Sequence, residues 1–264
     1  MSAAALLTPP RSALLACWTT AWLAADASLP ELVDKVTGHD DRHTVADLWV
    51  DELDLEQAVG RLRADGITAA RVVLPAAGDP LGLPGPGPFT QQALLAGEGV
   101  VAIRPDGTGT GLVPTVTAHG TELDGTVTSV VWSTFPIEIA GPDQGPFLHD
   151  AEHDLRRGIV AATNALVDLD VARWSPDLGD ALDDLRKAQR RGVDTDELPG
   201  SWPARAREVL NQARHIAAVL SLVGNDIGGA IDAREADARD RIVRDLSRIV
   251  RRARVAAYNA QVAS

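Results

Sequence analysis

The sequence predicts an α+β protein with an N-terminal mixed β-sheet and helices, followed by an all-helical C-terminal part of about four helices. Short apolar runs typical of strands occur only before about residue 148, and beyond it apolar residues recur at helical spacing. The chain has 264 residues, 45% of them hydrophobic, which is enough for one large core or two modest ones. We therefore predict an α+β domain over residues 1–147 and a helical domain over residues 148–264.

The first expected element is a buried helix capped by Ser12, with Leu15, Trp18 and Trp22 on its inner face. The same stretch resembles a secretion signal, but threonines interrupt its apolar run. That run is also far shorter than the ~20 residues of a membrane span. The single cysteine, Cys17, excludes an internal disulfide framework and fits a reducing compartment. We expect a cytoplasmic protein without a membrane segment.

The sheet region alternates strand and helix signals before ending in three strands. Asp54 is the expected cap of an amphipathic helix that stops at Gly66, and Gly97 closes a second short helix. This order predicts a mixed sheet with its helices on one side. The expected elements are a helix over 30–36, a strand over 44–50, a helix over 55–65, a strand over 67–75, a helix over 89–97, and strands over 100–105, 111–119 and 126–139.

Four helices are expected in the C-terminal part. The first carries apolar residues from Leu155 to Leu169 at helical spacing, and the second covers residues 175–192. The third begins near Ser201. The fourth begins with a capping box formed by Asp232 and Glu235 and continues to about residue 260.

Charge is distributed unevenly along the chain. The net charge is −12, and residues 1–150 contain 7 basic and 19 acidic residues, whereas residues 151–264 contain 18 of each. All of the excess negative charge therefore lies in the N-terminal half. Because an acidic surface repels phosphates, this argues against a nucleic-acid interface there.

Several segments resemble a known group of proteins. They are RVVLPAAGDPLGLPGPGPFTQQALLAGEGVV, GLVP, ATNALVDLDVARWSPDLGDAL and VAAYNA, which together extend over nearly the whole chain. In these segments the sequence is similar to a family from high-GC Gram-positive (actinobacterial) bacteria that has no assigned activity. The resemblance implies that both halves form one evolutionary unit and that the protein is cytosolic. It carries no catalytic residues over to this chain.

The Gly/Pro loop over residues 76–88 is a candidate binding loop, because it joins the end of a buried strand to the start of a helix. Its candidate residues are Asp79, Gly82, Gly85 and Gly87. Its four prolines each remove a backbone N–H, and Asp79 adds negative charge, so a phosphate cradle is not expected. The alternatives are a rigid docking loop and a stiff structural crossover.

The segment HDAEH matches an inverted zinc motif, in which two histidines one turn apart bind the metal and the glutamate transfers a proton. Its residues are His149, Glu152 and His153. Asp150 is the natural N-cap of the following helix, which would leave His149 outside the helix and out of register with His153. We therefore predict no metal site and keep a metal-dependent hydrolase as the alternative.

The remaining histidines and nucleophiles give little indication of catalysis. HDDRH, from His39 to His43, is expected to form a turn with exposed histidines. His119 is expected at a strand end and His215 on a partly exposed helix face. The sequence contains no G-x-S-x-G elbow, and Cys17 has no histidine nearby in the sequence.

The last helix has separate apolar and basic faces. Its arginine stripe is a candidate interaction face, formed by Arg241, Arg244, Arg248, Arg251 and Arg252. A solvated face with i,i+4 pairs between Asp237 and Arg241 and between Asp240 and Arg244 is the first interpretation. Contact with a protein and contact with nucleic acid are the alternatives.

These observations predict a cytosolic binding or protein-interaction protein without catalysis and without a cofactor. Its partner would be another protein or a second copy of the chain. The alternatives are the hydrolase with the H-x-x-E-H motif and a nucleic-acid accessory protein that uses the last helix. Nucleic acid is the less expected partner because the basic stripe lacks interleaved aromatic residues.

Overall fold

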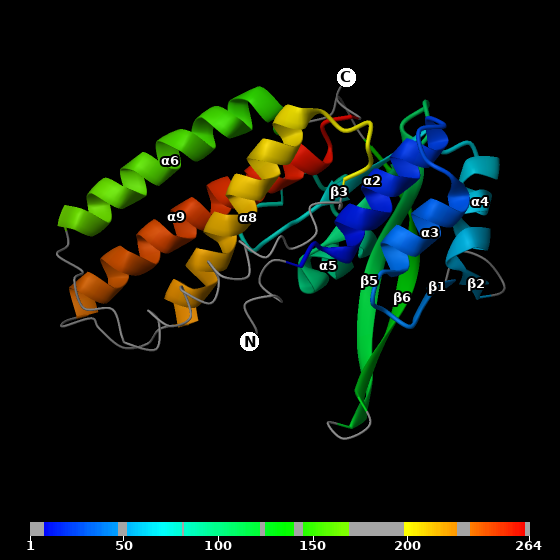
Figure 1. The fold of residues 1–264 in the computed structure, drawn as a ribbon, viewed down its shortest axis with the longest axis horizontal. Helices are drawn as coiled ribbons and strands as arrows, with labels where there is room; N and C mark the ends of the chain where they lie inside the picture. Colours follow the sequence, from blue (N-terminus) through cyan, green and yellow to red (C-terminus); the bar gives the residue numbers. More distant parts are fainter. Residues whose placement is uncertain are drawn as a thin grey trace. The chain divides into compact units, whose positions relative to one another are not determined.

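The computed structural model describes residues 8–46, 52–80, 82–121, 125–139, 145–168, 198–225 and 233–261 (Figure 1). Two compact units divide the chain. The first contains the sheet and comprises Pro9–Gly145, Asp196–Trp202 and Tyr258–Ser264. The second comprises Met1–Thr8, Pro146–Thr195 and Pro203–Ala257, and its described part is helical.

The sheet has six strands in the order β2-β1-β6-β5-β4-β3. β1 and β6 are parallel, and every other neighbouring pair is antiparallel, so the sheet is mixed as the sequence predicted. The strands are β1 Arg42–Ala46, β2 Leu53–Asp54, β3 Ala69–Val73, β4 Gly99–Ile103, β5 Thr108–Thr121 and β6 Gly125–Glu138.

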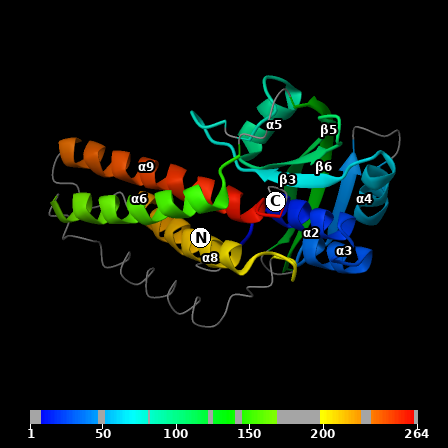
Figure 2. The same ribbon diagram turned by 90° about the horizontal axis from the view of Figure 1, so that it is seen from above.

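Helices lie on both faces of the sheet, which corrects the expectation of helices on one side. Figure 2 shows α2 and α3 on one side of the strands and α5 on the other. The helices of this unit are α2 Arg11–Leu23, α3 Leu29–Thr37, α4 Leu55–Ala64 and α5 Pro88–Ala96. Successive side chains along the strands are buried on opposite faces of the sheet. Val72, Val100 and Leu112 are buried on the α2 side, and their neighbours Val73, Val101 and Val113 are buried on the α5 side.

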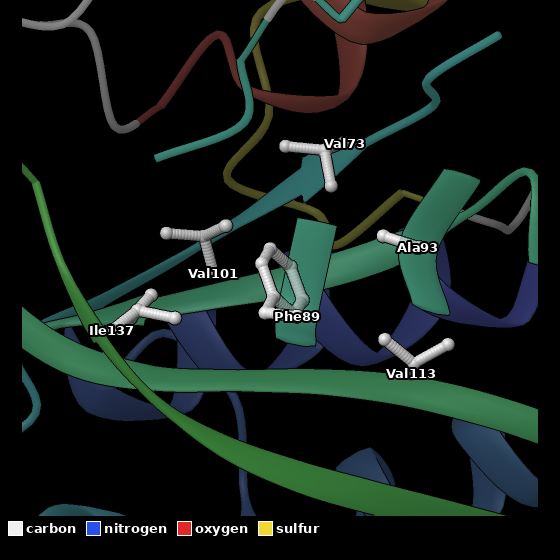
Figure 3. Close-up of a cluster of buried hydrophobic side chains, with 6 residues drawn as sticks. All are labelled: Val73, Phe89, Ala93, Val101, Val113 and Ile137. Carbon is white, nitrogen blue, oxygen red and sulfur yellow. The ribbon is translucent and has the colours of Figure 1, made fainter. Parts of the chain in front are cut away.

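The α5 side of the sheet holds an apolar cluster centred on the Phe89 ring (Figure 3). Two sheet glycines make room for that ring. A Cβ at Gly111 would lie 2.3 Å from Phe89 Cδ2, and one at Gly99 would lie 3.3 Å from the ring. A short helix therefore packs closely on the strands because these two positions have no side chain. The cluster consists of Val73, Phe89, Ala93, Val101, Val113 and Ile137.

The helix ends follow the predicted signals in most places. Asp54 caps α4 and forms a capping box with Gln57, and Gly97 ends α5 in the left-handed conformation at φ 73°. The start of α2 differs from the expectation. Its N-cap is Pro10, and the expected cap, Ser12, instead donates its backbone N–H to Glu98 Oε2 at 2.8 Å.

Three C-terminal helices lie within the described residues: α6 Leu148–Asp168, α8 Ala204–Asn225 and α9 Ala233–Tyr258. The helix expected over 175–192 lies outside the described residues. Gly158 on α6 permits close packing with α9, because a Cβ there would lie 2.8 Å from Ile249 Cδ1. The apolar face predicted for the last helix is buried at Val250, Ala253 and Ala257.

Two late segments of the chain belong to the unit with the sheet. Both meet at the Tyr258 carbonyl oxygen, which accepts from Trp202 Nε1 at 3.2 Å and from Cys17 Sγ at 3.3 Å. All three residues are buried. Cys17 is thus a packed core residue, and residues far apart in the sequence complete this unit together.

Candidate functional site

A partly buried network of polar side chains connects α2 with β1 and β6. Arg11 donates from Nε and Nη2 to the two Asp40 oxygens, at 2.6 and 2.7 Å. His43 Nε2 lies 3.0 Å from Asp40 Oδ2, and Trp132 Nε1 donates to His43 Nδ1 at 3.3 Å. The neutral imidazole therefore carries its proton on Nε2, where it donates to Asp40.

Burial and hydrogen bonds within this network shift the pKa values of His43 and Asp40. Burial lowers the pKa of His43, although the hydrogen bond to Asp40 opposes this shift. Burial would raise the pKa of Asp40, but hydrogen bonds from Arg11 and His43 outweigh it and leave that pKa lowered. With both ring nitrogens engaged and its side chain fully buried, His43 has no nitrogen left to serve as a base.

These positions correct the expectation of exposed histidines in HDDRH. The strand begins at Arg42, two residues before the predicted start, so His43 lies within β1 and points into the core. His39 is exposed as expected. The remainder of the predicted strand, residues 47–50, lies outside the described residues.

The predicted helix phase around residue 150 is wrong. α6 already begins at Leu148, and the Ala151 N–H bonds to the Phe147 carbonyl, so His149 and His153 both lie in the helix, one turn apart. Asp150 is therefore a first-turn residue and does not cap the helix. The geometric objection to the inverted zinc motif is thereby removed.

Arginines engage two of the three residues of this motif, Glu152 and His149. Glu152 is buried and accepts from Arg156 and from Arg205 Nε, the latter at 2.5 Å. The hydrogen bond from Arg205 is the main cause that lowers the pKa of Glu152. Arg205 Nη2 also lies 3.1 Å from His149 Nδ1. Two guanidinium groups repel a cation, and the described residues contain no cluster of three or more His, Cys, Asp or Glu that could hold one.

The Gly/Pro loop packs partly against the core. Gly82 has φ +85°, and a Cβ there would lie 3.1 Å from Val73 Cγ1, so this position serves close packing. Gly85 also has a positive φ of 130°, and Gly87 is the N-cap of α5. Asp79 is buried, and its backbone pairs with Ala76 in an isolated bridge. These contacts account for a structural crossover, and the binding role proposed for the loop stays a prediction.

The arginine stripe of α9 is largely solvent-exposed. Arg241, Arg244, Arg248 and Arg252 are exposed and Arg251 is half-buried. Arg241 Nε donates to the Asp237 backbone carbonyl at 3.2 Å, which is a different contact from the ion pair expected between their side chains. Arg248 Nη2 lies 3.5 Å from Asp245 Oδ1. The role of this stripe in an interaction also stays a prediction.

The outer edge of β3 is closed by two side chains. Thr20 Oγ1 accepts from the Ala70 N–H at 3.0 Å and donates to the Ala70 carbonyl at 2.8 Å. The Asn259 carboxamide does the same for Val72, with both distances 2.9 Å. Each side chain thus replaces the peptide group of a missing neighbouring strand. Such protection prevents an edge strand from pairing with another chain.

The β5–β6 hairpin, in contrast, has an open edge. Both strands have 14 residues and pair along their whole length. Within the described part of the chain, β4 pairs with β5 only at Gly109–Leu112, and β1 pairs with β6 only over 129–133. The rest of the hairpin extends beyond the other strands (Figure 1). No other described strand lies beside β5 after Leu112.

The register shows which backbone groups this edge presents. The backbone N–H and carbonyl groups of Ala70 and Val72 point away from β4. Because these directions alternate in an antiparallel sheet, the backbone groups of Val100 point toward β5 and those of Leu112 point toward β4. The same side of β5 then carries the backbone groups of Pro114, Val116 and Ala118. Pro114 has no N–H to leave unpaired, which explains why a proline is tolerated where β4 ends.

The segment Thr115–His119, called here the β5 edge, is exposed along its whole length. Val116 is 44% exposed, and Val127 on the paired strand is 46% exposed. Between Thr108 and Ile137 the charged residues are Glu122 and Asp124, which lie in sequence between β5 and β6. The described residues of both strands from Thr108 to Ile137 are therefore uncharged, and no other described strand pairs with the β5 edge. His119, expected at a strand end, lies inside β5, which continues to Thr121.

Sequence reasoning predicted both strands of the hairpin but missed the edge as a site. Strand lengths set the exposure, because β4 and β1 are only five residues long each. The available signal was the uncharged Thr- and Val-rich run, bounded by a proline, in a chain with 23% charged residues.

The fold and this edge define an α+β protein with a helical C-terminal part and an exposed β-ribbon. Two family models match the chain: the Rv1486c-like protein N-terminal domain over residues 12–146 and the Rv1486c-like protein C-terminal domain over residues 149–255. The chain belongs to the Rv1486c-like family.

Relatives of the chain are mycobacterial proteins. The uncharacterized protein Rv1486c of Mycobacterium tuberculosis is 28% identical, with 94% of this chain and 96% of the relative covered. The uncharacterized proteins ML1804 of Mycobacterium leprae and MAV321 of Mycobacterium avium are 27% and 26% identical, with the same coverage. No solved structure matches the chain. Within its described part, no helix has the length and apolarity needed to cross a bilayer.

Proposed function

We propose that this protein is a cytoplasmic protein-interaction protein that binds its partner through the β5 edge and acts without catalysis. The observation that carries the proposal is the contrast between the strand edges. Thr20 and Asn259 satisfy the outward backbone groups of β3, and the other outer strand, β2, has only two residues. Among the residues that the structure describes, no side chain closes the β5 edge, and β5 itself is long, with 14 residues.

The chemistry of the β5 edge indicates the kind of partner. An extended segment that adds to a strand edge gains main-chain hydrogen bonds, and alternate side chains then determine specificity. The side chains here are threonines, Val116, Ala118 and His119. Interface cores are depleted of charged residues, as this ribbon is. The partner segment should therefore be extended, uncharged and rich in small or β-branched residues.

The other polar clusters are engaged within the fold. Asp40 and His43 bind each other, Arg11 and Trp132, and Glu152 binds two arginines. These contacts disfavour the alternative of a metal-dependent hydrolase that uses His149, Glu152 and His153. The exposed arginine stripe of α9 would serve a nucleic-acid accessory protein, but it is accompanied by Asp237 and Asp245.

A charge placed on the ribbon tests the proposal. Val116→Lys adds a charge to the β5 edge, and Leu95→Lys adds the same charge to α5, where Leu95 is 81% exposed. Both variants and the unaltered chain would be used to capture partners from an extract of the source organism, with quantitative mass spectrometry. We expect a partner that is retained by Leu95→Lys and reduced about tenfold or more by Val116→Lys.

Two results would refute this proposal. One is a partner whose capture does not change in Val116→Lys. The other is measurable turnover in an activity screen together with the absence of any captured or self-associated partner.

A further inference from the structure

We infer that the β5 edge binds the β5 edge of a second copy of this chain, with the two strands antiparallel about a two-fold axis at Thr117. This inference rests on the proposed function and names the partner for the same edge. Closed two-fold dimers are the commonest oligomers, and their interface uses the same patch on both copies.

The limits of the edge are the first argument for a second copy. Pro114 lacks an N–H at one end, and Gly120 at the other end has φ +112°, outside the extended conformation. Both lie three residues from Thr117. A two-fold axis at Thr117 places Pro114 opposite Gly120 of the second copy, so the two interruptions coincide. An unrelated strand would have to match these interruptions by its own sequence.

The hydrogen-bond register is the second argument. Val116 and Ala118 direct their backbone groups outward, and the axis at Thr117 places Val116 opposite Ala118 of the second copy. Each of these two pairs exchanges an N–H and a carbonyl in both directions. All outward backbone groups between the two interruptions are then paired.

The side chains agree with this register. Val116 would lie beside the small Ala118 of the second copy, and Thr117 beside its own equivalent. Cross-strand Thr–Thr pairs and β-branched pairs are favourable in antiparallel sheets, whereas like charges directly opposite are destabilising. Each copy has a net charge of −12, but its β5 edge contains no acidic residue. Two acidic copies can therefore approach here without placing carboxylates against each other.

Cysteine cross-linking tests the register. In a pair without mutual hydrogen bonds, the two Thr117 Cα atoms would lie about 4.5 Å apart, within the range of a disulfide. In Thr117→Cys we expect a disulfide-linked dimer after mild oxidation of the full-length protein. Val127→Cys is the matched control, because the two Val127 positions would be three strand spacings apart, which is at least about 14 Å. Native Cys17 is buried and would not compete.

Sedimentation measurements on two further variants test the hydrogen bonds. Ala118→Pro removes an outward N–H at a position equivalent to that of the native Pro114, and Val116→Lys places like charges near the axis. For each variant we expect the dissociation constant of the dimer to rise at least about tenfold. We expect no change for Leu95→Lys. Val116→Lys keeps the test valid if Ala118→Pro does not fold, as circular dichroism would show.

The outcomes separate this inference from the proposed function. A dimer that is lost in both edge variants and cross-linked in Thr117→Cys supports the inference. If the protein is a monomer at all concentrations and Val116→Lys loses a partner captured from the extract, the second copy is not the partner. The proposed function is then retained. A dimer unaffected by both edge variants overturns the inference. The absence of both dimer and edge-dependent partner overturns the inference and the proposed function together.

Discussion

Replacement of Asn259 by alanine should destabilise the unit that contains the sheet. The carboxamide is the partner of both the N–H and the carbonyl of Val72, each at 2.9 Å, and Val72 is fully buried. An intramolecular hydrogen bond contributes about 1 kcal/mol net, and a buried group left without a partner costs roughly 1–3 kcal/mol. Asn259 itself is half-buried, so water can partly replace it. We therefore expect Asn259→Ala to lower the free energy of unfolding by about 2–3 kcal/mol.

Urea unfolding monitored by tryptophan fluorescence measures this loss, and hydrogen exchange of the Val72 amide locates it. Asn259→Asp should also be destabilising, because it keeps an acceptor for the Val72 N–H but loses the donor to its carbonyl. Asn211→Ala on the exposed face of α8 is the matched control and should change stability by less than about 0.5 kcal/mol. Unchanged stability and unchanged Val72 exchange in Asn259→Ala would refute the role of the carboxamide as a strand substitute.

Two other predictions concern the core and the pH dependence. Gly111→Ala places a Cβ 2.3 Å from the Phe89 ring and should lower the free energy of unfolding in urea by about 1–3 kcal/mol. Gly60→Ala in α4 is the control, because its Cβ would have no atom within 4 Å, and it should be neutral or stabilising. Equal effects of the two variants would contradict the close packing at Gly111. The pKa of His43 is lowered from its ordinary 6.5 in the folded protein, so the unfolded chain binds more protons below about pH 6.5. We therefore expect the urea concentration at the unfolding midpoint to decrease when the pH is lowered from about 7.5 to about 5. His43→Gln should flatten this dependence, and an equally steep fall in that variant would show that other groups cause it.

Local signals predicted most of the sheet and its helices. Asp54, Gly66 and Gly97 act through their own backbone and side-chain chemistry, so the sequence identifies the ends of α4 and α5 directly. The parallel pairing of β1 with β6 connects segments about 90 residues apart. A segment's own periodicity contains no information about its neighbour in the sheet, so strand order had to come from the structure.

The errors at His43 and α5 originate in tertiary contacts, whereas the error at Asp150 is local to the start of α6. The side chain of Asp150 is typical of a helix cap, but α6 begins at Leu148, and the Ala151 N–H already bonds to the Phe147 carbonyl. The segment HDDRH follows a glycine and precedes a strand, which predicts a turn with exposed histidines. The burial of His43 depends on Trp132, a residue 89 positions away. The placement of α5 on the far face depends on two glycines that leave room for Phe89.

The closure of the β3 edge has a consequence for protein synthesis. Translation produces Ala70 and Val72 early, and Thr20 is already available to satisfy the first of them. The backbone groups of Val72 stay without this partner until residue 259, which is 187 positions later in the sequence, has left the ribosome. During that interval a nascent strand with unsatisfied amides is exposed to other chains, so ribosome-associated chaperones should have their greatest influence on the yield of this protein in that period.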